Sequence, residues 1–516
     1  RPIKISIPKN GNNGTILYKW FLDLYRMNTS VPYDVSLPAG TSFGVNENRP
    51  FRMIAFKLDE FGINALNIED VNNINMQAGG TADIAFMAYN KAAFDIKSPK
   101  IDQFPVSRNV CVVPNTTGVS FNTLASIDGG ASSPVDPKET LEYQWYRNFE
   151  PIPGATSSTY TLTSVDETDL ITYKVRVRNE FGAVDLPVTL AEGGTPTFWN
   201  GTTWQLPAAL IAAGVTVSEA DRNLIFTENY NENTNLVGCD CRIPAGKTAT
   251  IPEGKTLKLY GAITIEDIIP AVIDVDGNTV LSPAIPAGQF TLENNASLIQ
   301  TKPVTTNENS GAIRVQRLAD NLHTNDFVYW SSPVSDFNLS SIPGNNGFRW
   351  ETNTVNALGT AGNWMPYSGL MEAGRGYIKR VPSAVSFTNT FVGKPNNGPL
   401  SNNVYKSTTG TLLAVDNRHW NLVGNPYPSA LNATKFLTDN TNIEGSVNLW
   451  THNTEGSINP ANSPYYQNFV YNYGNQYVTF NGTASVPAGF AGFIGSGQGF
   501  FVKVLEASAP VSTVNF

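Results

Sequence analysis

Short apolar runs that alternate with polar residues and end at Gly, Pro or Asn recur along the whole chain, and they predict strands. In residues 1–103, Ile3–Ile7 alternates with period two, and Ala82–Ala88 does the same. Thr15–Met27 is ambiguous, because its apolar residues fit a helical face better than a strand face. We expect a β-rich N-terminal domain whose topology the pattern does not fix.

Residues 104–192 contain a strand centred on Trp145 and a strictly alternating stretch, Asp169–Val177. Immunoglobulin-type sandwiches bury a Trp and place a Tyr two residues before the second core cysteine. Trp145 and Tyr173 match these two positions, and Val175 stands where the cysteine would be. The segment resembles a bacterial immunoglobulin-like (Ig-like) domain that lacks the disulfide.

Residues 193–302 open with a Gly/Thr/Pro linker and then repeat an apolar-x-apolar step followed by Pro or Gly. Ile243–Gly246 and Leu257–Gly261 illustrate this step. Short strands with turns every eight to twelve residues fit a sandwich, and a repeated step fits a coiled β-solenoid. The pattern leaves both architectures open.

An internal repeat marks residues 303–516. Trp350–Thr354 is echoed by Trp450–Thr454, and Gly374–Val381 is echoed by Gly497–Val504. Two similar β-halves, each with a Trp-rich entry and a Gly-x-Gly strand near its end, predict a duplicated sandwich that shares one core.

The halves of this repeat span about 303–400 and 401–516. The longer spacing in the second half predicts an inserted aromatic segment around Asn459–Tyr473. Ala433–Leu437 is the expected short helix, with Asn432 as its N-cap. The predicted fold class is therefore all-β and multi-domain, with an Ig-like sandwich, a β-solenoid-like or sandwich segment, and a duplicated β-sandwich.

Composition narrows the function classes. Only 15% of the 516 residues are charged, and the formal net charge is -9. An acidic chain with no basic face argues against nucleic acid as a partner. The absence of any run of about 18 apolar residues argues against a transmembrane helix. Three His residues leave little material for His-based catalysis.

Motifs from about residue 198 onward resemble the conserved C-terminal region of secreted and cell-surface proteins that the type IX secretion system of Bacteroidota exports. They cover about three fifths of the chain in the family order. The residues that carry the resemblance are Phe198–Gly201, Cys239–Cys241, Tyr329–Val334, Gly374–Ile378, Asn421–Ala430, Leu449–Thr454 and Gly497–Phe501.

This resemblance implies export across the outer membrane to the cell surface or medium. It implies the type IX translocon or its shuttle protein as a partner during export. In that family a β-sandwich sorting domain follows, and this sequence stops at Val514–Phe516 before it. The first residues, Arg1–Ile3, contain no initiator Met or signal peptide, so we expect a mature or fragmentary product.

Three cysteines offer candidate chemistry. Residues i and i+2 of a strand share a face, so Cys239 and Cys241 could meet one partner. We expect structural cysteines, reduced or bridged, ahead of a strained Cys239–Cys241 disulfide, and a metal site last. Cys111 is the odd cysteine, and we expect it to be a buried, inert thiol.

Other motifs favour structural roles. Asp274–Thr279 resembles the start of a calcium loop but lacks the closing acidic residue, which favours a plain hairpin turn. Gly374-x-Gly376 and Gly497-x-Gly499 lack the Lys-Ser/Thr of a phosphate loop, so we expect tight backbone packing before a core strand. His323, His419 and His452 are scattered, and His419 is expected at the rim or in the core.

Aromatic residues could stack on sugar rings, or they could fill the core. For Trp350 and Trp450 we favour the core, and for Tyr465–Tyr477 both alternatives stay open. The remaining candidates of this kind are Trp330, Trp364 and Trp420.

The sequence therefore predicts a non-enzymatic, exported, adhesin-like or structural surface protein. It assigns no catalytic, cofactor-binding or metal-binding residue and no cofactor. The alternatives are a carbohydrate-binding surface protein, with surface glycans as partners, and an accessory C-terminal part of a larger secreted enzyme.

Overall fold

The computed structural model describes part of the chain, in two compact units. The described residues are 3–8, 16–21, 75–78, 97–111, 118–273, 280–355, 361–381, 385–408, 418–452 and 476–516. Unit 1 comprises Arg1–Arg108 and Val113–Ala191, and unit 2 comprises Asn109–Val112 and Glu192–Phe516. No helix in these ranges is long and apolar enough to cross a bilayer.

Unit 1 contains an antiparallel N-terminal sheet in the order β2-β1-β3. Its strands are β1 (Ile3–Pro8), β2 (Ile16–Phe21) and β3 (Asn75–Ala78). The strand predicted at Ile3–Ile7 is confirmed. The helical preference for Thr15–Met27 is wrong over β2, where Ile, Tyr, Trp and Phe favour a pleated surface. The strand expected at Ala82–Ala88 lies outside the described residues.

The Ig-like sandwich follows. Strands β12, β11, β8 and β9 are consecutive neighbours in one antiparallel sheet, and β4–β7 and β10–β6 form two further pairs. The elements are β4 (Pro99–Gln103), β5 (Arg108–Val110), β6 (Val119–Asn122), β7 (Leu124–Ile127), η5 (Pro137–Glu139), β8 (Glu142–Arg147), β9 (Glu150–Pro151), β10 (Thr159–Leu162), η6 (Glu167–Asp169), β11 (Thr172–Asn179) and β12 (Gly182–Glu192).

The Ig-like match rests on the core of this sandwich. Trp145 and Tyr173 are fully buried, and the Trp145 indole donates to the Ser157 carbonyl at 2.9 Å. The Tyr173 hydroxyl donates to the Asp169 carbonyl at 3.2 Å, which is the tyrosine-corner bond of such sandwiches. Val175 is buried in place of the missing cysteine. Apolar packing therefore replaces the disulfide as the centre of the core.

Removing the Tyr173 hydroxyl tests the tyrosine corner. We expect Tyr173→Phe to lower the free energy of unfolding of the Ig-like domain by about 1 kcal/mol, because the bond to Asp169 is lost inside the core. The measurement is hydrogen exchange of the β8 and β11 amides. Tyr160→Phe is the control, since Tyr160 packs 5.9 Å from Tyr173. Equal effects of the two variants would contradict this role.

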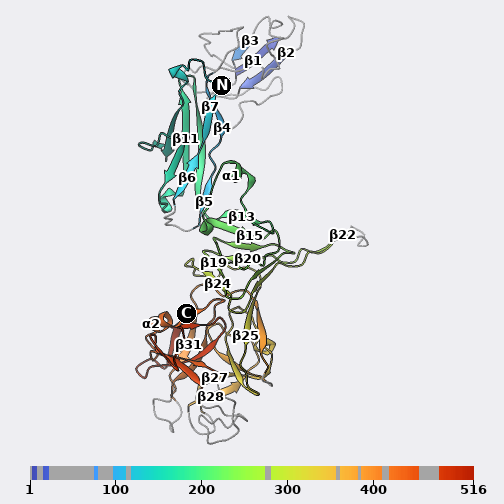
Figure 1. The fold of residues 1–516 in the computed structure, drawn as a ribbon, viewed down its shortest axis with the longest axis vertical. Coiled ribbons are helices and arrows are strands. Elements are labelled where there is room, and N and C mark those ends of the chain that lie inside the picture. Colours follow the sequence, from blue (N-terminus) through green and yellow to red (C-terminus); the bar gives the residue numbers. More distant parts are fainter. Residues whose placement is uncertain are drawn as a thin grey trace. The chain divides into compact units, whose positions relative to one another are not determined.

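Unit 2 begins with parallel strand pairs. The parallel ladders are β13-β15-β17-β20, β16-β19-β24 and β18-β23-β25. In Figure 1, β13, β15 and β20 of the first ladder follow one another down the view, as do β19 and β24 of the second. The elements are β13 (Thr195–Trp199), β14 (Trp204–Gln205), α1 (Ala208–Ala212), η7 (Glu219–Asp221), β15 (Arg222–Ile225), β16 (Leu236–Gly238), β17 (Cys241–Ile243), β18 (Thr248–Ile251), β19 (Thr256–Leu259), β20 (Ile263–Ile265), β21 (Val272–Ile273), β22 (Val280–Ser282), β23 (Gln289–Leu292) and β24 (Ser297–Gln300).

Antiparallel strands make up the remainder of unit 2. One sheet has the order β26-β29-β27-β28, and a second has the order β32-β38-β34-β35-β36. The elements are β25 (Ile313–Ala319), β26 (Phe327–Trp330), η8 (Leu339–Ser341), β27 (Asn345–Val355), β28 (Ala361–Pro366), β29 (Tyr377–Arg380), β30 (Phe387–Gly393), β31 (Ser401–Tyr405), β32 (Trp420–Gly424), β33 (Leu431–Asn432), α2 (Ala433–Asp439), β34 (Val447–Trp450), β35 (Tyr477–Phe480), β36 (Ser485–Val486), β37 (Phe493–Ile494), β38 (Gly499–Lys503) and β39 (Val511–Asn515).

These two sheets follow one plan. In each, the strand after a Gly-x-Gly motif (β29 or β38) pairs with an opening strand (β26 or β32) and with a Trp-bearing strand (β27 or β34). In each half, a strand before the sheet pairs with a strand after it, as β25–β30 and β31–β39. The predicted helix is confirmed as α2, and Asn432 caps it by accepting from the Lys435 amide.

Candidate functional site

The second Gly-x-Gly motif lies against the opening strand of the first half. The Gly497 carbonyl accepts from the Ser331 amide at 2.7 Å, and Gln498 forms a β-bridge with Trp330. A Cβ on Gly499 would lie 3.1 Å from the Trp330 carbonyl oxygen. The motif therefore uses the missing side chain of glycine to bring two backbones together.

The first Gly-x-Gly motif makes the reciprocal contact. The Gly376 amide donates to the Leu422 carbonyl of β32 at 3.0 Å, and the Gly424 amide donates to the Gly374 carbonyl at 3.0 Å. A Cβ on Gly376 would lie 2.7 Å from the Val423 carbonyl oxygen. The expectation of tight backbone packing is confirmed for both motifs, and each motif packs on the opposite half.

An aromatic cluster fills the space between the two sheets. The Trp350 indole donates to the Trp420 carbonyl at 2.8 Å and so ties β27 to β32. Trp350 is buried, as expected, and Trp450 is partly buried against the same cluster. The cluster consists of Phe327, Tyr329, Trp350, Trp364, Ile378, Leu422 and Phe501, with Phe348, Trp420, Trp450 and Tyr477 packed on it.

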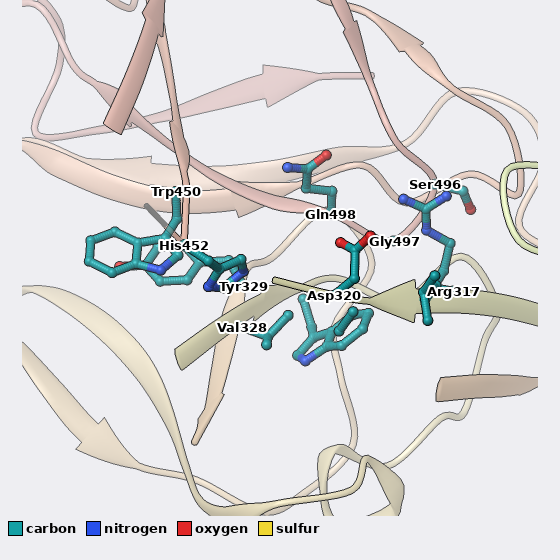
Figure 2. A pocket seen from close by; sticks show the side chains of 12 residues that line it. Arg317, Asp320, Val328, Tyr329, Trp450, His452, Ser496, Gly497 and Gln498 are labelled. Atoms are coloured by element: carbon teal, nitrogen blue, oxygen red, sulfur yellow. The ribbon is translucent and has the colours of Figure 1, made fainter. Parts of the chain in front are cut away.

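A cleft of about 130 Å³ opens where the halves meet. β25 and the residue that follows it supply Arg317 and Asp320, and β26 supplies Val328–Trp330. The second half supplies Trp450 and His452 from the end of β34, and Ser496–Gln498 from the Gly-x-Gly turn. Figure 2 shows Trp450, His452 and Tyr329 at one end and Arg317 at the other, with Asp320 and Gln498 between them.

The aromatic end of the cleft is rigidly packed. Tyr329 stacks on Trp450, with the ring centroids 5.4 Å apart and the planes at 3°. The Tyr329 and Tyr477 hydroxyls are hydrogen-bonded at 2.9 Å, and Tyr477 packs edge-on against Trp450 at 5.1 Å. Because both halves contribute to this group, it holds the cleft wall in place.

A buried carboxylate orients His452. The Asp326 side chain is 1% exposed, and its Oδ2 lies 2.5 Å from His452 Nδ1. Asp326 Oδ1 accepts from the Phe327 amide at 2.8 Å. Asp326 precedes β26 and His452 follows β34, so this pair also joins the two halves.

The polar end of the cleft combines a cation, an anion and an amide. The Arg317 guanidinium donates to Asn295 Oδ1 at 2.7 Å, and burial lowers the pKa of Arg317. Asp320 is exposed to solvent. Gln498 Oε1 accepts from the Gly495 amide at 3.2 Å, which fixes the amide plane. The cleft thus presents both donors and acceptors on positioned side chains.

An imidazole held by a buried carboxylate is also the arrangement of a general base. Ser496 lines the same cleft, but its hydroxyl donates to the Tyr427 carbonyl at 2.8 Å and is not the partner of His452. Ser496 is therefore held by the Tyr427 carbonyl, and His452 is held by Asp326.

Removing His452 tests the pair between the halves. We expect His452→Ala to lower the free energy of unfolding of unit 2 by about 3 kcal/mol, because the Asp326 carboxylate is left buried without its partner. Equilibrium urea unfolding measures this. The control, His323→Ala, changes a partly buried His and is expected to stay within about 0.5 kcal/mol. A small effect at His452 would exclude a stabilising pair.

Comparison with known proteins places most of unit 2 in one family. Residues 220–516, more than half of the chain, match the family model described as a domain of unknown function, DUF8693. The chain belongs to this family. Both Gly-x-Gly motifs and the whole cleft lie inside the DUF8693 region. A search of curated protein sequences gave no match.

Solved structures give weaker similarities. A chimeric titin Z1Z2-Z1Z2 tandem is 16% identical over 20% of this chain, with a TM-score of 0.16, and the match spans about half (52%) of the tandem. The four N-terminal Ig domains of Dscam1 isoform 9.44 are 19% identical over 18% of this chain and 20% of theirs, with a TM-score of 0.14. The titin Ig tandem A164-A165 is 9% identical, and the match covers 58% of this chain and 96% of the tandem, with a TM-score of 0.15.

The cysteine predictions need correction. Cys111 and Cys239 form a disulfide, with their Cα atoms 5.5 Å apart, so Cys111 is not an inert thiol. Cys239 is not bridged to Cys241, which remains a free, buried thiol of the DUF8693 region. Motif spacing does not reveal this pair, because the two cysteines are 128 residues apart and only the fold brings them together.

Hydrogen bonds hold the Cys111 segment in unit 2. The Cys111 amide donates to Asp221 Oδ1 at 2.8 Å, and the Gly193 amide donates to the Val110 carbonyl at 2.9 Å. Burial raises the pKa of Cys241 well above its usual value, and the nearby Asp240 charge adds to this shift. Cys241 is therefore a poor nucleophile and a poor metal ligand at neutral pH.

The disulfide can be tested with reductant. We expect reduction of the wild-type protein to lower the free energy of unfolding of unit 2 by about 2–5 kcal/mol, because the disulfide closes a long loop. The Cys111→Ala/Cys239→Ala variant should show the same loss without reductant and no further change with it. Cys241→Ala is the control and should keep the reductant effect. A Cys111→Ala/Cys239→Ala variant whose stability still falls with reductant would exclude this pairing.

The remaining candidate residues do not gather into one site. His419 is buried, accepts from the Ser407 amide at Nδ1, and lies 2.6 Å from Glu506 through Nε2. The hydrogen bond from His419 lowers the pKa of Glu506. In the described part of the chain, no group of three His, Cys, Asp or Glu side chains could hold a metal ion. Asp274–Thr279 and the aromatic segment Asn459–Tyr473 lie outside the described residues.

Sequence reasoning missed the polar residues of the cleft. Arg317, Asp320 and Asp326 carry no motif, and each is an ordinary charged residue within a strand or directly beside one. Gln498 was visible as the variable residue of the second Gly-x-Gly motif. Because the first motif carries Arg375 at that place, the difference between the repeats was the one signal that could have pointed to it.

Proposed function

We propose that this protein is an exported, non-enzymatic surface or secreted protein, adhesin-like or structural, that leaves the cell through the type IX secretion system. After export it is located at the cell surface or in the extracellular medium. During export it engages the outer-membrane translocon or its shuttle protein. The motif resemblance from residue 198 onward motivates the route, and it overlaps the DUF8693 region.

The Cys111–Cys239 disulfide carries the proposal best. Disulfides form and persist in oxidising compartments and are rare in the reducing cytosol. Both sulfur atoms belong to cysteines that are 2% exposed, so the bond is part of the core of unit 2. A buried disulfide that links distant parts of the chain supports folding outside the cytoplasm.

We infer that the architecture is that of a repetitive stalk. Three ladders of parallel strands support a short β-solenoid over residues 193–302, because consecutive coils pair in parallel. The common strand plan of the two antiparallel sheets supports a duplication of residues 303–516. Such stacked β-modules project a binding surface without chemistry of their own, which suits an adhesin.

Carbohydrate binding is the second candidate function, and the cleft between the halves favours it. The third, an accessory region of a larger secreted enzyme, is compatible with the same fold. Of the aromatic candidates, Trp330, Trp350 and Trp364 are buried, so they serve the core and do not offer open sugar-stacking faces.

Export can be tested in the producing bacterium. We expect protease shaving of intact cells, or analysis of the culture medium, to detect the tagged gene product in the wild type. In a strain that lacks the type IX translocon, it should accumulate in the periplasm with its disulfide formed. A periplasmic protein of the same strain controls for lysis. Equal surface exposure in both strains, or retention in the cytoplasm of the wild type, would contradict the proposal.

A further inference from the structure

We propose that the cleft between the two halves binds a single neutral sugar residue. The proposal concerns the DUF8693 region alone and does not depend on the export route. It assigns a ligand class to Asp320, Gln498 and Arg317, which have no role in the core clusters of unit 2.

The polar groups of the cleft suit hydroxyl groups. Arg317 has N–H donors beyond the one that Asn295 accepts, and Asp320 is a solvent-exposed acceptor. Gln498 carries a donor and an acceptor on one plane. Each hydroxyl of a sugar donates one hydrogen bond and accepts others. A ring with adjacent hydroxyls can therefore bond to the donors and to the acceptors of the cleft at the same time.

The charge of the cleft argues for a neutral ligand. The Arg317 cation and the Asp320 anion cancel, and the His452 imidazole already pairs with the buried Asp326 carboxylate. A phosphate or carboxylate ligand would meet Asp320 unfavourably, and an ammonium group would meet Arg317 unfavourably. A neutral, polyhydroxylated molecule avoids both penalties.

The size and shape of the cleft also favour a single sugar ring. A volume of about 130 Å³ lies below the range of pockets for drug-sized ligands, so the cleft can hold no more than a small ligand such as one sugar ring. At the aromatic end, the partly buried Trp450, whose ring is fixed by stacking on the buried Tyr329, forms the apolar side of the site. Polar groups at one end and aromatic groups at the other match the two kinds of surface on a pyranose.

Binding can be measured by saturation-transfer difference NMR on the intact protein. The probes are the methyl glycosides of glucose, galactose, mannose and N-acetylglucosamine, with N-acetylglycinamide as a small amide control. We expect saturable binding of at least one glycoside with a Kd on the order of 1 mM, the scale for a ligand of this size. Probe concentrations should reach about twenty times that constant.

Matched variants assign the binding to the cleft. We expect Asp320→Asn to weaken glycoside binding about tenfold or more, since a charge-assisted hydrogen bond is lost. Asp439→Asn changes an exposed carboxylate of α2, outside the cleft, and should leave binding unchanged. Gln498→Ala provides a second cleft variant, with urea unfolding as the check that each variant is folded.

Four results would overturn the proposal. The first three are no binding of any glycoside at those concentrations, binding of the amide control alone, and equal binding by Asp320→Asn and the wild type. Loss of binding in Asp439→Asn as well as in Asp320→Asn would place the site elsewhere and would also overturn it. None of these results bears on export, which is measured in cells.

Discussion

The close approach of two backbones at the Gly-x-Gly motifs is the constraint on which the rest of the DUF8693 region depends. Each motif hydrogen-bonds to the opening strand of the opposite half, through Gly497 to Ser331 and through Gly374 to Gly424. A side chain at Gly376 or Gly499 would meet a carbonyl of that strand. This reciprocal contact makes two separate sheets into one body, and it sets the spacing at which the aromatic cluster can fill the space between them.

The cleft is a consequence of the same contact. The turn that contains Gly497 carries Ser496 and Gln498 to the edge of β26, where they meet residues of the first half. The Asp326–His452 pair and the stacked Tyr329 and Trp450 rings then join the halves around the opening. The residues that line the cleft therefore come from strands, strand ends and the Gly-x-Gly turn of both sheets.

Local patterns in the sequence predicted a large part of this structure. The Ig-like core at Trp145 and Tyr173 and the α2 helix with its Asn432 cap follow from local patterns and are confirmed. The tight packing of the glycines is confirmed as well, but the strands that they pack on lie far away in the chain. The Cys111–Cys239 disulfide and the polar residues of the cleft depend on contacts between residues that are far apart in the chain. Periodicity and motif spacing carry no information about such contacts. The strand at Ile16–Phe21 shows a further limit of local patterns. Its apolar residues fit both the helical and the strand period, and only pairing with Ile3–Pro8 decides between the two.

The unfolding free energy of alanine variants at the glycines tests the central claim most directly. Gly376→Ala and Gly499→Ala place a methyl group against the backbone of the opposite half, whereas Gly445→Ala points into open space and is the matched control. The account predicts that each of the first two variants lowers the free energy of unfolding of unit 2 by about 2 kcal/mol or more, as overpacking does, while Gly445→Ala changes it by less than about 0.5 kcal/mol. Equal, small changes at all three glycines would contradict the claim that these contacts hold the two halves together.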